Sequence, residues 1–235
     1  MTVGESYKLQ VSGTLFDLDG TLVDSTPSVV SYWYDFAAKY GFDAAKVLET
    51  SHGRRSKDTL AELKPELATD EFISQMEGQI PIRWGDQAKL IEGSKALLDS
   101  LPSSKWAIVT SGTYPLASGW LKMFGFVIPS VFITAERVTR GKPDPAGYSM
   151  AHDALKLADG QPFLVFEDAP AGITAGKLAG ATVIGIASTY SAVEVFAAGA
   201  DYVVADLTHV KYFGTNVETG LLDIEIQDPL FVRSP

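Results

Sequence analysis

The feature that most constrains the fold is a series of short apolar, β-rich runs that alternate with helix-like stretches. Such runs occupy residues 11–18, 106–109, 131–133, 163–166, 183–186 and 202–204, and turn residues follow them. Strands that are apolar throughout, with helices between them, indicate a parallel sheet covered on both faces. We therefore predict an α/β fold whose core is a doubly wound, Rossmann-like parallel sheet.

One long segment interrupts this alternation. Between residues 24 and 91 the chain shows helical patterning at 27–40, 56–63 and 70–84, and no convincing strand. This is more chain than an ordinary connection requires. We therefore predict a catalytic core formed by residues 1–24 and 93–235, with an inserted α-helical cap at residues 25–92.

Two smaller patterns give further expectations about packing. Trp33, Tyr34 and Phe36 lie at helical spacing and are expected to fill the interior of the cap. Near the C-terminus, apolar residues alternate with polar or acidic ones over residues 222–226. This alternation predicts a half-exposed edge hairpin, to which we assign no chemistry.

Composition excludes several classes of function. The chain has 29 acidic and 19 basic residues and a net charge of -10, which disfavours binding to nucleic acid or to an anionic membrane. It has no cysteine, and its histidines at 52, 152 and 209 are far apart, so disulfides and a zinc cluster are not expected. Because no leader-like or membrane-spanning run is evident, we expect a cytoplasmic protein, and a monomer by default.

Two carboxylates mark the end of the first predicted strand. Asp17 and Asp19 flank Leu18 where this strand runs into a glycine turn. The carboxyl ends of strands are where open α/β sheets place their sites, and two close carboxylates need a cation or a raised pKa. Mg²⁺ prefers such ligands. On its own, however, this pattern fits a solvated turn equally well.

Hydroxyl and basic groups follow two later strands. Thr110, Ser111 and Gly112 offer a hydroxyl and backbone N–H groups suited to a phosphate oxygen, although either hydroxyl could simply cap a helix. Lys142 precedes a proline-rich segment that would hold its ammonium in one place, although most lysines are merely exposed. Together these residues predict a phosphate-binding edge.

A second pair of acids follows the strand predicted at 163–166. Glu167 and Asp168 could cap the next helix. Alternatively, a third carboxylate at the same edge of the sheet would complete a magnesium site with Asp17 and Asp19.

These four segments, taken in order, resemble the motifs of the haloacid dehalogenase-like phosphatase superfamily over nearly the whole chain. They read DLDGT at 17–21, TSG at 110–112, GKP at 141–143 and EDAPAGI at 167–173. Residues 51–55, 105–112 and 165–173 look like the fungal branch of 2-deoxyglucose-6-phosphate and glycerol phosphatases. Within that branch, residues 141–148 and 199–204 resemble the 2-deoxyglucose-6-phosphate phosphatases more than the glycerol phosphatases. Hydrolysis of 2-deoxyglucose 6-phosphate or related hexose and polyol phosphates is thus expected, with a glycerol-phosphate phosphatase as the alternative.

The resemblance also implies a role for each residue. Asp17 would be the nucleophile that forms an aspartyl-phosphate, and Asp19 the general acid and then the general base. Mg²⁺ would be held by Asp17, the backbone carbonyl of Asp19, and Asp168. Glu167 would contact a metal-bound water or orient Lys142. The transferring phosphoryl group would meet Thr110, the Ser111 N–H, Gly112 and Lys142.

Selectivity for the rest of the substrate is expected to come from the cap. His52, Gly53, Arg54 and Arg55 form a compact basic cluster, unusual in so acidic a chain, that could reach down to the substrate. A solvated basic turn is the alternative.

Three other activities fit the sequence less well. Related phosphomutases carry a cap histidine where this chain has Val29, so hydrolysis is favoured over mutase activity. Dehalogenases do not keep an acid corresponding to Asp19. A non-enzymatic phospho-aspartate regulatory domain would need neither the helical cap nor Asp19.

Overall fold

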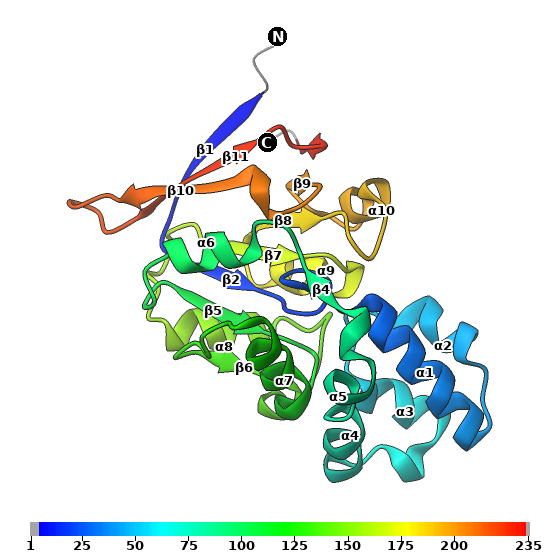
Figure 1. Ribbon diagram of the computed structural model, residues 1–235. Coiled ribbons are helices and arrows are strands. Elements are labelled where there is room, and N and C mark those ends of the chain that lie inside the picture. The colour runs from blue at the N-terminus through cyan, green and yellow to red at the C-terminus, as the bar shows by residue number, and fades with distance from the viewer. Residues whose placement is uncertain (1–4, 234–235) are drawn as a thin grey trace.

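The computed structural model describes residues 5–233 and confirms the doubly wound α/β core (Figure 1). A seven-stranded sheet has the order β12-β9-β8-β7-β2-β5-β6, and every neighbouring pair is parallel except β12 with β9. The strands are β2 (Thr14–Phe16), β5 (Trp106–Val109), β6 (Phe132–Ile133), β7 (Leu164–Glu167), β8 (Thr182–Ile186), β9 (Tyr202–Val204) and β12 (Phe231–Val232).

Both faces of this sheet are buried, as the continuous apolar runs predict. Side chains alternate between two hydrophobic clusters along each strand, so that Leu15 belongs to one cluster and Phe16 to the other. Phe16 stacks on Phe166 of the neighbouring strand with ring centroids 4.5 Å apart. The helices of the core are α6 (Ser94–Ser100), α7 (Tyr114–Phe124), α8 (Ala146–Ala154), α9 (Pro170–Leu178) and α10 (Ala192–Ala197).

Five helices between β2 and α6 lie together beside one end of the sheet (Figure 1). They are α1 (Thr26–Tyr40), α2 (Ala44–Ser51), α3 (Ser56–Leu63), α4 (Asp70–Glu77) and α5 (Ile80–Trp84). The helix expected over residues 70–84 is interrupted after Glu77. We refer to these helices as the cap.

Two features of the cap differ from the expectation. Helix α2 was not predicted; Asp43 begins it by accepting the backbone N–H groups of Ala45 and Lys46. A short antiparallel ladder, β3 (Val23–Asp24) with β4 (Lys89–Leu90), pairs the two connections that join the cap to the core. The segment predicted to lack strands therefore ends in one.

The aromatic residues of α1 correct another expectation. Trp33 and Phe36 are buried in the cap, with ring centroids 5.9 Å apart, but Tyr34 is 54% exposed. Residues three apart share a face of a helix, whereas adjacent residues do not. Tyr34 therefore does not belong to the interior that Trp33 and Phe36 fill.

The strand expected at 11–18 is shorter in the structure, where β2 covers residues 14–16 and Val11 ends a separate strand of another sheet. β1 (Ser6–Val11) pairs with β11 (Leu222–Gln227), which also pairs with β10 (Val210–Thr215), and all three strands are antiparallel. Gly13 lies between β1 and β2, where an added Cβ would come within 2.9 Å of the Lys105 carbonyl oxygen. β11 alternates between buried and half-buried residues as predicted, but it is the central strand of this sheet and not an edge strand.

Within residues 5–233, the helices are all too short or too polar to cross a lipid bilayer.

Candidate active site

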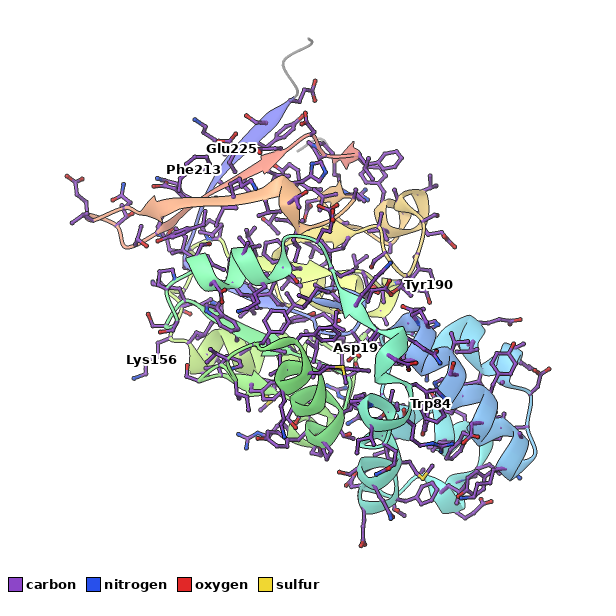
Figure 2. All side chains as sticks on the ribbon, in the orientation of Figure 1. Asp19, Trp84, Lys156, Tyr190, Phe213 and Glu225 are labelled. Carbon is purple, nitrogen blue, oxygen red and sulfur yellow. The ribbon has the colours of Figure 1, made fainter. Side chains whose placement is uncertain are left out.

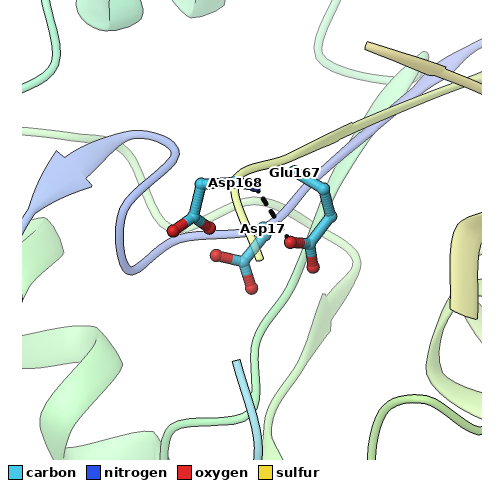
Figure 3. Close-up of side chains that lie close together, drawn as sticks. All are labelled: Asp17, Glu167 and Asp168. Carbon is cyan, nitrogen blue, oxygen red and sulfur yellow. Dashed lines mark hydrogen bonds between the residues drawn. The ribbon is translucent and has the colours of Figure 1, made fainter. Parts of the chain in front are cut away.

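The predicted catalytic carboxylates meet at the carboxyl ends of two neighbouring parallel strands. Phe16 of β2 pairs with Phe166 of β7, so Asp17 and Glu167 follow at the same level of the sheet. Oxygen atoms of Asp17, Glu167 and Asp168 lie within 4.8 Å of one another, and Figure 3 shows these side chains grouped together. All three are buried. The topology thus brings together residues that are 150 positions apart.

Lys142 lies against two of these acids. Its Nζ donates to Asp17 Oδ1 at 2.5 Å, to Glu167 Oε1 at 2.6 Å and to the Val109 carbonyl oxygen at 3.0 Å. Burial by itself would lower the pKa of Lys142, but the charges of Asp17 and Glu167 raise it above its usual value. The ammonium is therefore charged at neutral pH.

Every acceptor position of the Glu167 carboxylate is occupied by a protein donor. Oε1 accepts from Lys142 and from the Tyr148 hydroxyl, and Oε2 accepts the N–H groups of Asp168 and Ala169. A carboxylate offers about four lone-pair sites, so none remains on Glu167 for a cation, although its oxygens lie close to those of Asp17 and Asp168. Of the two roles considered for Glu167, this arrangement supports the orientation of Lys142.

Gly172 makes room for that carboxylate. A Cβ on Gly172 would lie 1.6 Å from Glu167 Oε1. Tyr148 was not identified from the sequence, where it looks like an ordinary aromatic residue of a core helix.

Asp17 and Asp168 form the part of the cluster that suits a divalent cation. Burial raises the pKa of Asp17, an effect that Lys142 opposes, and burial together with Glu167 raises the pKa of Asp168 to about 7. Three buried carboxylates face one ammonium, so a second positive charge would favour the ionised forms. Oxygen ligands are those that Mg²⁺ prefers, and the donor set fits this ion.

The approach of Asp168 to the first loop depends on Gly20. Its φ is +90°, and an added Cβ would lie 2.1 Å from Asp168 Oδ2. The glycine of the DLDGT motif is thus required by a close contact as well as by the turn.

Asp19 has a different environment from Asp17. Its Oδ1 accepts hydrogen bonds from Ser25 Oγ at 2.6 Å and Trp120 Nε1 at 2.9 Å, and its Oδ2 accepts one from Thr110 Oγ1 at 3.4 Å. Burial raises the pKa of Asp19, although these hydrogen bonds oppose the shift. Figure 2 places Asp19 where the core meets the cap helices. Ser25 and Trp120 were missed because neither belongs to a recognisable motif.

A cavity of about 70 Å³ lies between this edge of the core and the cap. Asp17, Asp19, Thr110, Ser111, Gly112 and Asp168 line it from the core, and His52, Gly53 and Arg54 line it from the cap. Of the predicted site residues, Lys142 and Arg55 instead line a smaller neighbouring cavity.

The basic cluster of the cap separates into three environments. Arg55 is buried, and its guanidinium donates to Asp58 and to the carbonyl oxygens of Val138 and Thr139 in the core. Its donors are thus used to attach the cap to the core, and the expected contact with substrate finds no support. Arg54 pairs with Glu62 at 2.7 Å. Burial lowers the pKa of His52, which favours the neutral imidazole.

Two further contacts join the cap to the core across the cavity. Ser111 Oγ donates to the Gly53 carbonyl oxygen at 2.7 Å, and the Thr113 N–H donates to Glu77 Oε2 at 2.8 Å. Glu77 also lines the cavity, and sequence analysis missed it. Its position four residues after Ile73 and three before Ile80, both buried, places an acid within an apolar helical stripe, which is the signal that could have identified it.

Comparison with known proteins agrees with this geometry. A family model described as haloacid dehalogenase-like hydrolase matches residues 11–180. Glycerol-1-phosphate phosphohydrolase 2 of Saccharomyces cerevisiae is 37% identical to this chain, and the match covers 96% of this chain and 94% of the relative. For 2-deoxyglucose-6-phosphate phosphatase 1 of the same yeast, the identity is 42% and the coverages are 92% and 95%.

A solved structure shows the same architecture. A hydrolase from Pseudomonas syringae has a TM-score of 0.70 at 29% sequence identity, and the match covers 83% of this chain and 94% of that one. The four motifs, the capped parallel sheet and these matches together show that the chain belongs to the haloacid dehalogenase-like hydrolase family.

Proposed function

We propose that this protein is a Mg²⁺-dependent phosphatase that hydrolyses small sugar or polyol phosphates through an aspartyl-phosphate on Asp17. The observation that carries this proposal is the different treatment of two neighbouring carboxylates. Asp17 is held by the Lys142 ammonium, whereas Asp19 is half-buried and is held by neutral donors. Pairs of acids with such different environments divide into a nucleophile and a proton carrier.

The reaction proceeds in two displacements. In the first, a carboxylate oxygen of Asp17 attacks phosphorus, the bond from phosphorus to the ester oxygen breaks, and protonated Asp19 gives its proton to the leaving alkoxide. In the second, ionised Asp19 takes a proton from a water molecule that attacks the phosphorus of the aspartyl-phosphate. Asp17 is released as a carboxylate, and inorganic phosphate is the second product.

Lys142 and the backbone of the second motif stabilise the phosphoryl group. The charged Lys142 adjoins Asp17, and Thr110, Ser111 and Gly112 line the cavity beside it. Asp17, Asp168 and the Asp19 carbonyl would hold Mg²⁺, which supplies further neutralisation of the charge that develops in phosphoryl transfer. Glu167 and Tyr148 act through Lys142 by fixing its ammonium.

As substrates, we propose 2-deoxyglucose 6-phosphate and related hexose or polyol phosphates. This proposal rests on the fungal motifs and on the 42% identity to the yeast deoxyglucose-phosphate enzyme. Glycerol phosphate is the second candidate, favoured by the small cavity of about 70 Å³ and by the 37% identity to the glycerol-phosphate enzyme. Val29 lines this cavity and offers no proton, in keeping with hydrolysis and not phosphate migration.

A panel of phosphate esters tests the proposal. Release of inorganic phosphate from 2-deoxyglucose 6-phosphate, glycerol 1-phosphate and a hexitol phosphate is measured with Mg²⁺ and with EDTA. We expect Mg²⁺-dependent turnover and a higher kcat/KM for the hexose ester. A strong preference for glycerol 1-phosphate would replace the hexose assignment. No Mg²⁺-dependent release from any of the three esters would reject the proposed function.

A further inference from the structure

We infer that Glu77, Tyr32 and Ser51 form a hydroxyl-binding wall in the cap, which selects phosphate esters whose leaving group carries hydroxyls beyond the ester oxygen. The inference rests on the proposed function and assigns the specificity of the same site to residues outside the four motifs. Each of the three residues lines the cavity from the cap side and is buried.

Glu77 is a buried carboxylate that the phosphoryl chemistry does not use. It is 4% exposed on α4, and the Thr113 N–H donates to one of its oxygens, Oε2. A hydrogen bond from the Ser56 side chain also opposes the rise in the pKa of Glu77. A carboxylate can accept about four hydrogen bonds, so these contacts still leave acceptor positions for a donor from the cavity. Buried acids without such a donor are costly, which makes a substrate hydroxyl a suitable partner.

Tyr32 and Ser51 carry hydroxyl groups that have no partner among residues 5–233. Tyr32 Oη and Ser51 Oγ are both buried and form no hydrogen bond within this part of the chain. Most buried polar groups in proteins are hydrogen-bonded, and an unsatisfied one lowers stability. Their position on the wall of the cavity indicates that a bound molecule completes their hydrogen bonds.

The leaving group is the part of the substrate that would meet this wall. Asp19 gives its proton to the ester oxygen, so the rest of the leaving group extends from Asp19 into the cavity. Asp19 and Glu77 line the same cavity, Asp19 from the core and Glu77 from the cap. The wall and the proton carrier therefore face the same space.

Glu77 has a competing structural explanation. Thr113 is the N-terminal flanking residue of α7, so the contact from its N–H to Glu77 could serve only to close the cap onto the core. A residue that only closes the cap would affect all phosphate esters alike. A residue that binds hydroxyls would affect hydroxylated esters much more than an ester of equal length without them.

The test compares glycerol 1-phosphate with propyl phosphate, which have three carbons each and differ in two hydroxyls. The matched pair for the hexose candidate is 2-deoxyglucose 6-phosphate and hexyl phosphate. We expect Glu77→Gln to lower the ratio of kcat/KM for the hydroxylated ester to that for the plain ester by about 10-fold or more, mainly through KM. The control variant is Glu71→Gln, an exposed acid of the same helix, which should leave the ratio unchanged.

Tyr32→Phe provides a second variant that keeps the ring and its packing. Because it removes an unpartnered hydroxyl, we expect an unchanged or higher Tm without substrate but a ratio lowered by about 3-fold to 10-fold. An unchanged ratio in both variants, or an equal loss for both esters, would overturn the inference. Failure of the wild-type protein to hydrolyse either ester with Mg²⁺ would instead reject the proposed function.

Discussion

The core side and the cap side of the cavity differ in how completely their polar groups are bonded. On the core side, Asp19 accepts three hydrogen bonds from the protein, and Asp17 accepts one from Lys142, whose ammonium also binds Glu167 outside the lining of the cavity. On the cap side, Tyr32 Oη and Ser51 Oγ are buried without partners in the part of the chain that the structure describes. The groups proposed for catalysis are thus bonded before substrate arrives, whereas those proposed for recognition keep hydrogen-bonding capacity that the protein does not use.

This difference has a physical basis. Transition-state stabilisation needs dipoles and charges that do not have to reorganise during the reaction, so the protein itself must satisfy them. Recognition of a leaving group needs free donors and acceptors that the ligand will satisfy. The two sides should therefore respond differently to substitution, and the following predictions test that expectation.

The largest effect is expected from the nucleophile. Asp17→Asn replaces a carboxylate with a poorly nucleophilic amide, and we expect Mg²⁺-dependent kcat to fall by about 10⁴-fold or more. Phosphate release measures kcat, and circular dichroism checks the fold. Asp99→Asn, on an exposed helix surface, is the control and should retain activity. Substantial remaining turnover would show that Asp17 does not carry the phosphoryl group.

Lys142→Met tests whether Asp17 and Glu167 depend on the Lys142 ammonium for their stability in the core. Removing the ammonium leaves Asp17 and Glu167 buried without their charge partner. We expect a loss of about 3–5 kcal/mol in the free energy of unfolding, from urea denaturation, together with a large fall in kcat. Lys95→Met, which breaks an exposed pair with Asp99, should cost less than about 1 kcal/mol. An equal loss in the free energy of unfolding for both variants would contradict the claim that the core groups depend on one another.

The raised pKa of Asp168 predicts a pH dependence of the metal-free protein. Its carboxyl titrates at about 7 when folded and near 4 when unfolded, so the folded state holds the proton more tightly. The resulting stabilisation is complete below about pH 4 and is lost as pH rises through about 7, at most about 4 kcal/mol. Urea denaturation in EDTA should therefore show lower stability at pH 8 than at pH 5.

Two variants separate the metal ligand from its neighbour in that experiment. Asp168→Asn should reduce the pH dependence and the stabilisation by Mg²⁺ at pH 8. Glu167→Gln should lower kcat more than it changes the Mg²⁺ concentration for half-maximal activity, because its oxygens already bind protein donors. A Mg²⁺ requirement equally impaired in both would place Glu167 among the metal ligands.

The smallest effect is expected where the cap attaches to the core without facing the cavity. Arg55→Lys keeps the charge but loses the paired contacts to Asp58 and to the core carbonyls. We expect kcat/KM to fall by about 5-fold, equally for hydroxylated and plain esters. Arg83→Lys, in an exposed pair with Asp35, is the matched control. A selective loss on hydroxylated esters would instead support the contact between Arg55 and substrate that the sequence predicted.

Much of the core could be predicted from sequence because its signals are local. A fully apolar run that ends in Asp17, or in Glu167 and Asp168, identifies both a buried strand and the sheet edge where its acids emerge. A motif of this kind predicts both the strand and the position of its acids at the end of that strand. The predicted strand at 11–18 began too early because Ser12 and Gly13 do not interrupt the apolar pattern strongly, and only pairing with β11 assigns Val11 to a different sheet.

The sequence by itself determined the parallel sheet and the helical insertion, since each follows from hydrophobic period and turn chemistry. Its four motifs carried the resemblance from which the acids, the hydroxyl and the lysine of the site were predicted. Only the tertiary structure decided which side chains from distant parts of the chain contact each other. It directed Arg55 to the core carbonyls, filled the acceptors of Glu167, placed Glu77 on the wall of the cavity and bonded Trp120 to Asp19. Such contacts join residues far apart in the chain, and no local pattern encodes where two distant side chains meet.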